Sequence, residues 1–195
     1  LYDRPGEDPL FDEAMSLIGE YDSLLSKTAE GSDIYRINHA DGSPVEVDAR
    51  TAELLSIALS YASLSDGLVD PTIGTLSDLW NFGDTNEGIV PSREDIEEAL
   101  SHIDYTKVKL SGNTVTLLDP KARLDLGFIA KGYIADKLKA FLIENGVENG
   151  IINLGGNVLT IGTKPDGSDY HIGVQKPFAE TGTALTTLTV RDRYL

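Results

Sequence analysis

One stretch of the sequence, residues 124–136 (LDLGFIAKGYIAD), constrains the fold more than any other because it joins a predicted strand to a predicted helix. Residues 115–118 indicate the strand, which Pro120 closes. From Ile129 onward, apolar residues recur every three or four positions, which is typical of a helix with one buried face. Those residues are Ala130, Ile134, Leu138, Phe141 and Leu142. Asn145-Gly146 ends the predicted helix, since glycine readily adopts the left-handed conformation.

The start of this helix also carries polar groups that suggest a binding site. Gly127 lies near the helix N-terminus, where unpaired backbone N–H groups and the helix dipole favour an anion. Lys131 can add a positive charge on the same side, whereas Asp125 disfavours a phosphate unless a divalent cation lies between them. The group therefore suggests a metal-bridged diphosphate. The alternative is that Asp125 caps the helix and Lys131 is simply solvated, and no Gly-Lys-Ser/Thr sequence makes this a Walker A loop.

Composition and charge exclude several classes of protein. The 195 residues are 41% hydrophobic and 25% charged, enough for one domain or for one large and one small lobe. The net charge of −16 argues against nucleic acid as a partner. No apolar run approaches the ~20 residues of a membrane span, and no basic-then-apolar signal segment opens the chain. The absence of cysteine excludes disulfides, thiolate zinc sites and cysteine nucleophiles.

Three further helices follow from apolar periodicity and capping residues. Pro9 can start the first, and Asp48 and Ser92 can cap the other two. The three predicted helices span residues 10–25, 49–65 and 93–102. The expected buried stripe of the second helix is Ala52, Leu55, Ala58, Leu59 and Ala62.

The remaining elements are predicted as extended segments. Alternating patterns around Ser111-Gly112-Asn113 are a hairpin signal, and Asp41-Gly42 indicates a turn. The extended segments are expected at residues 34–38, 45–47, 105–110, 114–118, 150–154, 158–161, 170–174 and 184–190. Helices followed by consecutive strands predict an α+β fold, a mostly antiparallel sheet with flanking helices.

Two glycine-rich segments and the histidines have more than one interpretation. Residues 67–83 turn at Asp70-Pro71-Thr72 into a predicted short helix, where Trp80 and Phe82 either pin a loop or border a ligand site. Residues 153–157 (NLGGN) form either a tight hairpin turn or a place where a ligand approaches the backbone. The histidines show no HExxH spacing. We expect His102 to respond to a helix dipole and His171 to lie on a strand surface.

Three motifs taken together resemble one known family. Residues 70–83 (DPTIGTLSDLWNFG), 124–136 and 152–162 (INLGGNVLTIG) occur in the order and rough spacing of the FAD:protein FMN transferases. This is the ApbE-like family, once labelled thiamine-biosynthesis lipoproteins. Residues 26–38 also resemble a segment near the N-terminus of that family. The similarity runs through nearly the whole chain.

The resemblance implies a flavin-transferring enzyme. The family binds FAD with Mg²⁺ across its diphosphate, transfers FMN to a threonine of a target flavoprotein and releases AMP. Some members hydrolyse FAD to FMN and AMP instead. A third alternative is a non-catalytic flavin-binding envelope protein.

The resemblance also implies roles for individual residues. Asp125 would contact the flavin nucleotide, the backbone carbonyl of Phe128 would bind the metal, and Lys131 would lie at the cofactor as a phosphate clamp. The catalytic pair would therefore be Lys131 and Asp125. Residues 68–70 (Leu68, Val69 and Asp70) would contribute to the FAD pocket. Thr28 falls where many members place an aromatic ring against the flavin.

The family's later motifs and its initial strand are not found in the 195 residues, so we expect residues 1–195 to be a partial ApbE-like domain. Members are commonly exported, so the resemblance implies an extracytoplasmic protein anchored to the cell membrane through an upstream lipoprotein signal.

Overall fold

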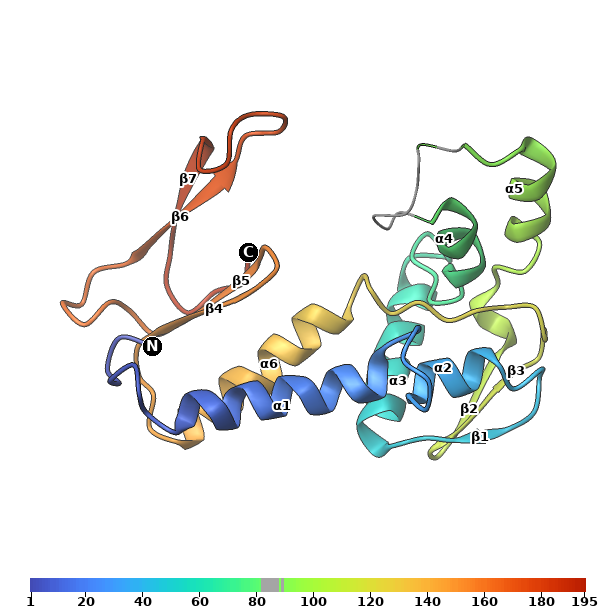
Figure 1. Cartoon of the computed structure of the whole chain (residues 1–195), viewed down its shortest axis with the longest axis horizontal. Coiled ribbons are helices and arrows are strands. Elements are labelled where there is room, and N and C mark those ends of the chain that lie inside the picture. The colour runs from blue at the N-terminus through green and yellow to red at the C-terminus, as the bar shows by residue number, and fades with distance from the viewer. Residues whose placement is uncertain (82–87, 89) are drawn as a thin grey trace. The chain divides into compact units, whose positions relative to one another are not determined.

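The computed structural model describes residues 1–81, 88 and 90–195 (Figure 1). The chain divides into two compact units. The first contains Leu1–Ile18 and Lys131–Leu195, and the second contains Gly19–Ala130. Helix α1 (Leu10–Leu25), predicted with these bounds, runs from the first unit into the second.

The core of Gly19–Ala130 forms around helix α3 (Ala49–Leu64), which the sequence predicted. The Asp48 carboxylate accepts a hydrogen bond from the Arg50 N–H at 2.8 Å, which satisfies a free donor of the first turn. The predicted stripe is buried except for Leu59, and two further residues, Thr51 and Leu54, are fully buried as well. Burial extends over more of the helix surface than one narrow stripe, because α3 is covered on more than one side.

A small antiparallel sheet belongs to the same unit (Figure 1). Its strands are β1 (Val45–Glu46), β2 (Val108–Ser111) and β3 (Thr114–Leu117), in the order β1-β3-β2. The predicted hairpin is confirmed, since Ser111 pairs with Thr114 across the turn. A short 3₁₀ helix, η1 (Tyr105–Lys107), replaces the first residues of the predicted strand.

The prediction of an extended piece at residues 34–38 is wrong. The segment is helix α2 (Asp33–Asn38). Ser32 caps it by accepting the Tyr35 N–H at 3.1 Å. Ile34 and Ile37 lie three positions apart and are both buried, as a helix requires.

Two helices complete the second unit and agree with the sequence. Helix α4 (Gly74–Trp80) follows the predicted turn, and helix α5 (Arg93–Leu100) is capped by Ser92, as expected. Phe82, which we expected to cover this region, lies outside the described residues.

The first unit contains helix α6 (Ala130–Glu144), the helix predicted from residue 129 onward. The helix ends at Glu144, and Gly146 just after it has a left-handed φ of 77°, as predicted. Two antiparallel hairpins follow, all four strands close to their predicted positions (Figure 1). They are β4 (Gly150–Leu154) with β5 (Asn157–Ile161), and β6 (Tyr170–Gln175) with β7 (Ala184–Val190).

One hydrophobic cluster joins α1, α6, β4 and β5 of this unit. It joins α6, through Ala135, Leu138 and Leu142, to the buried residues of β4 and β5 and to Leu10 of α1. All strand pairs named above are antiparallel, which confirms the α+β class. No described helix is both long and apolar enough to cross a membrane.

Candidate functional site

Asp125 is held in place by backbone contacts on both sides. The N–H and C=O of Leu124 bond to the side chain of Asn38 at 2.7 and 3.0 Å, and the Asp125 N–H donates to the carbonyl of Pro71 at 2.9 Å. Leu124 and Leu126 are buried. In an extended segment alternate residues point to opposite sides, so Asp125 is directed away from the core that its neighbours fill.

The carboxylate of Asp125 accepts three hydrogen bonds. Its Oδ2 accepts from Lys27 Nζ at 2.9 Å and from Ser77 Oγ at 2.7 Å, and its Oδ1 accepts from the Gly127 N–H at 2.9 Å. Lys27 Nζ also donates to Ser77 Oγ at 3.1 Å and to Asp78 Oδ1 at 2.8 Å. We call Lys27, Ser77, Asp78 and Asp125 the Lys27 cluster. It joins the loop after α1, helix α4 and the segment before α6.

These contacts stabilise the charged forms of Asp125 and Lys27. Burial raises the pKa of the Asp125 carboxyl, but bonds from Lys27, Gly127 and Ser77 outweigh it and leave that pKa below its ordinary value. Burial lowers the pKa of Lys27, but bonds to Asp78 and Asp125 outweigh it and raise the pKa. Lys27 is therefore a fixed cation and cannot act as a base for Ser77 at neutral pH.

The prediction that Gly127 offers an unpaired N–H to an anion is wrong. This N–H is bonded to Asp125 Oδ1, and the N–H groups of Ile129 and Ala130 both bond to the carbonyl of Leu126. An aspartate two residues before a backbone donor forms such a local turn readily. The alternative expected Asp125 to cap the helix, but its carboxylate instead closes the turn at Gly127, and α6 begins at Ala130.

Lys131 meets the glycine turn of the first unit. Its side chain is exposed in the first turn of α6, and a Cβ added to Gly155 would lie 3.6 Å from its Nζ. Gly155 and Gly156 have φ values of 60° and 99°, and the Gly156 N–H donates to Asn153 Oδ1 at 2.9 Å. Two of the three sequence motifs therefore meet here. The interpretation of residues 153–157 as a tight hairpin turn is confirmed. Gly155 of this turn lies beside the ammonium group of Lys131.

The residues that the resemblance assigns to the FAD pocket differ in their surroundings. Leu68 is 92% exposed and Val69 is 36% exposed, in the loop after α3. Asp70 already has partners, since its Oδ1 accepts from the Thr72 N–H and hydroxyl and its Oδ2 from the Tyr105 N–H at 2.9 Å. Asp70 therefore braces this loop against η1.

Thr28 and Phe128 are both open to solvent. The Thr28 hydroxyl lies 3.3 Å from that of Ser26 and offers no aromatic surface to a flavin. Phe128 is 48% exposed, so its ring does not fill the core.

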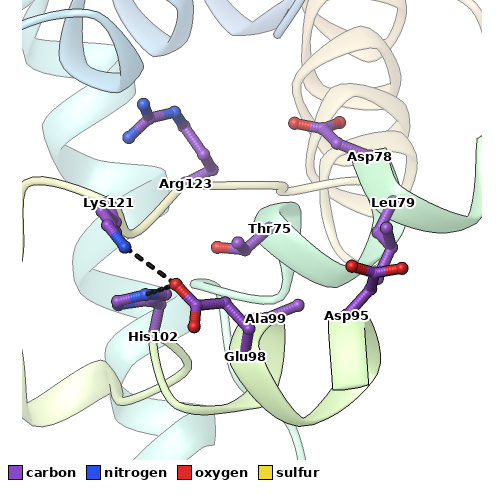
Figure 2. A pocket seen from close by; sticks show the side chains of 9 residues that line it. All are labelled: Thr75, Asp78, Leu79, Asp95, Glu98, Ala99, His102, Lys121 and Arg123. Carbon is purple, nitrogen blue, oxygen red and sulfur yellow. Dashed lines mark hydrogen bonds and ion pairs between the residues drawn. The ribbon is translucent and has the colours of Figure 1, made fainter. Parts of the chain in front are cut away.

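A cavity of about 450 Å³ lies between α4, α5 and the segment 121–123 (Figure 2). His102 lines this cavity. Its Nδ1 lies 2.8 Å from the Asp119 carboxylate, so a side-chain contact holds the ring in addition to the helix end that we expected to influence it. Lys121 Nζ donates to Glu98 Oε1 at 2.8 Å, and one of the two dashed lines that meet at Glu98 in Figure 2 marks this bond. Thr75 Oγ1 and His102 Nε2 are buried there without a hydrogen bond among the described residues, although Glu98 Oε1 lies 3.7 Å from His102 Nε2.

Sequence reasoning missed the Lys27 cluster as a unit. Lys27 lies 98 residues from Asp125 and 50 from Ser77. All of these residues fall inside segments that resemble the family, but no spacing signal shows that they meet.

The comparisons with known proteins agree with the motifs. A family model described as the ApbE family matches residues 1–194. The FAD:protein FMN transferase of Klebsiella pneumoniae (strain 342) is 36% identical over 190 residues, covering 96% of this chain and 58% of that protein. The enzyme of the same description from Treponema pallidum (strain Nichols) is 30% identical over 197 residues, covering 93% of this chain and 54% of that protein.

A solved structure agrees as well. The crystal structure of the ApbE protein of Thermotoga maritima superposes with a TM-score of 0.88 at 31% identity, over 98% of this chain and 62% of that one. The helices and antiparallel sheets described above therefore form an ApbE-type α+β fold. The chain belongs to the ApbE family, and it spans about half the length of the curated relatives it matches.

Proposed function

We propose that the protein acts as an FAD:protein FMN transferase, which moves FMN from FAD to a threonine hydroxyl of a target flavoprotein and releases AMP. The observation that carries the proposal is the fixed Asp125 carboxylate, which lies in a segment that resembles a motif of the FAD:protein FMN transferases. Flavin transfer breaks the diphosphate of FAD and joins the FMN phosphate to the threonine oxygen, while AMP leaves with the other phosphate.

Asp125 is suited to orient the flavin nucleotide. An ionised carboxylate offers about four acceptor positions. Three of those of Asp125 are filled by Lys27, Ser77 and Gly127, so one position on Oδ1 remains for a donor of the ligand. Since the side chain is already fixed, little conformational freedom is lost when the nucleotide binds.

Lys131 is suited to bind phosphate oxygens. Its ammonium lies over a turn in which Gly155 and Gly156 carry no side chain, so a ligand can approach the backbone closely. Negative charge develops on the phosphate oxygens as the diphosphate bond breaks, and a nearby cation stabilises that charge more in the transition state than in the ground state.

Magnesium belongs to the proposal through the resemblance, and the fit of the described residues to it is limited. Among the residues that the structure describes, no group of three or more histidine, aspartate or glutamate side chains could hold a metal ion. We assign it one ligand, the backbone carbonyl of Phe128. When bound, magnesium would neutralise diphosphate charge. No step above depends on it.

The remaining assignments rest on the resemblance. We propose that the exposed loop of Leu68 and Val69, braced by Asp70, borders the FAD pocket, and that Thr28 lies near the flavin. We also propose an extracytoplasmic location with a lipid anchor, which cell fractionation and labelling with a radioactive fatty acid would test.

The experiment that tests the function incubates the protein with FAD, Mg²⁺ and a flavoprotein carrying an acceptor threonine, beside a target in which that threonine is replaced by valine. We expect covalent flavin on the first target only, with an equal amount of AMP. Free FMN with both targets would indicate FAD hydrolysis instead. Bound FAD without AMP would indicate a non-catalytic flavin-binding protein. Either result would overturn the transferase proposal.

A further inference from the structure

The ammonium of Lys27 lies where a cation bound to Asp125 would lie. Its N–H donors are directed at three oxygen atoms, Ser77 Oγ at 3.1 Å, Asp78 Oδ1 at 2.8 Å and Asp125 Oδ2 at 2.9 Å. Hydroxyl and carboxylate oxygens of this kind are also the ligands of hard divalent cations. The Lys27 ammonium therefore occupies the position among these three oxygen atoms that a metal ion would otherwise take.

This arrangement decides between two roles for Asp125. The side chain can orient the nucleotide, or it can hold a metal ion or a metal-bound water. Oδ2 accepts from both Lys27 and Ser77, which fills its acceptor positions. A divalent cation at Oδ2 would have to displace the ammonium, and one at the open position of Oδ1 would share the same carboxylate with it. Like charges held this close together repel strongly.

The Ser77 hydroxyl forms a second link between Lys27 and Asp125. It accepts from Lys27 Nζ at 3.1 Å and donates to Asp125 Oδ2 at 2.7 Å, so Oδ2 is bonded to Lys27 both directly and through Ser77. The Gly127 N–H holds Oδ1 at 2.9 Å. These contacts fix the rotation of the carboxylate, because turning it would break bonds on both oxygens.

We propose that Lys27 is a positioning residue: its ammonium takes the place of a metal ion at Asp125 and leaves one acceptor position of Oδ1 for the flavin nucleotide. Asp125 therefore contacts the nucleotide and is not a magnesium ligand. This inference rests on the proposed function, since it concerns how FAD is held.

The test measures FAD affinity and metal affinity separately. The dissociation constant of FAD is obtained from quenching of flavin fluorescence, and that of Mn²⁺ for the FAD complex from the electron paramagnetic resonance signal of free Mn²⁺. The variants are Lys27→Met, Asp125→Asn and the double variant. Lys109→Met, which removes an exposed lysine from β2 in the same unit, is the matched control.

We expect Lys27→Met and Asp125→Asn each to weaken FAD binding about tenfold, the size of one hydrogen bond to a charged group. The double variant should be no weaker than either single variant, because both changes remove one shared interaction. The Mn²⁺ affinity of the FAD complex should stay within about twofold, and Lys109→Met should behave as the unmodified protein.

Ser77→Ala keeps the test valid if Lys27→Met does not fold, since it removes one hydroxyl and should weaken FAD binding about threefold. Unchanged FAD affinity in Lys27→Met, or in Ser77→Ala where that is the variant that folds, would overturn the inference. So would a tenfold loss of Mn²⁺ affinity in Asp125→Asn. If the unmodified protein does not bind FAD, the proposed function fails and this inference fails with it.

Discussion

Asn38 and Leu124 lie 86 residues apart and are joined by two hydrogen bonds between the side-chain amide of one and the backbone of the other. Asn38 Nδ2 donates to the Leu124 carbonyl at 3.0 Å, and the Leu124 N–H donates to Asn38 Oδ1 at 2.7 Å. Both residues are buried. The amide thus takes the place of a neighbouring strand, and it fixes the residue directly before Asp125.

Replacing Asn38 by alanine should therefore destabilise the protein. The substitution leaves a buried N–H and a buried C=O of Leu124 without partners, at a cost of roughly 3 kcal/mol. Urea unfolding followed by circular dichroism would measure the loss. Asn113→Ala is the control, because the backbone carbonyl of Asn113 accepts from the Val47 N–H and survives the change. Equal stability of the two variants would contradict the structural role of Asn38.

Gly74 at the start of α4 should not tolerate a side chain. A Cβ at this position would lie 2.5 Å from the carbonyl oxygen of Arg123, which already accepts the Gly74 N–H at 3.0 Å. Gly74→Ala should therefore lower stability by about 1–3 kcal/mol, as overpacking against backbone does. Gly19→Ala, in α1 with nothing within 4 Å of the added Cβ, should instead raise it by up to about 1 kcal/mol. Thermal melts would show opposite shifts, and shifts of the same sign would refute the explanation.

The sequence predicts most of the secondary structure because long segments carry a clear period. Helices α1, α3 and α6 repeat apolar residues over several turns, and the strands alternate. Helix α2 was mistaken for an extended piece because its six residues contain only two buried apolar positions, Ile34 and Ile37. A segment of six residues is too short to show a clear helical period. The capping residue Ser32 is the stronger indication of a helix here.

The site is predictable only where its residues are close in the sequence. Asp125 and Lys131 stand in one motif, so the sequence predicts a role for both of them together. Lys27 bonds to Asp125 across 98 residues, and only tertiary structure brings the two together. The hydrogen bond between the Gly127 N–H and Asp125 is local in the sequence. The same N–H could instead have stayed free at a helix N-terminus, and the spacing of apolar residues does not show which of the two arrangements forms.

The Lys27 cluster should make stability depend on pH in the acidic range. The pKa of Asp125 is lowered in the folded protein, and that of an unfolded aspartate is about 3.9. A depressed carboxyl pKa stabilises the folded state above the unfolded value, and this stabilisation is lost as pH falls through the folded value.

The stability difference between the unmodified protein and Asp125→Asn should therefore be constant from pH 7 to about pH 5 and shrink below about pH 4. Urea unfolding at a series of pH values measures it. Asp22→Asn, in the exposed polar face of α1, should give a smaller difference than Asp125→Asn at pH 7. A difference for Asp125→Asn that grew as the pH fell would contradict the ion pair with Lys27.

Lys131 should affect turnover far more than stability. Its side chain is exposed and lies over the Gly155 turn, so Lys131→Met removes a cation without opening the core. If the ammonium stabilises charge that develops on the phosphate oxygens, AMP release at saturating FAD should fall about 100-fold, as removal of one such donor typically causes. Lys176→Met, an exposed lysine of the same unit, is the control and should keep both turnover and melting temperature. Unchanged turnover in Lys131→Met, in a protein that transfers flavin, would show that the phosphate clamp lies elsewhere.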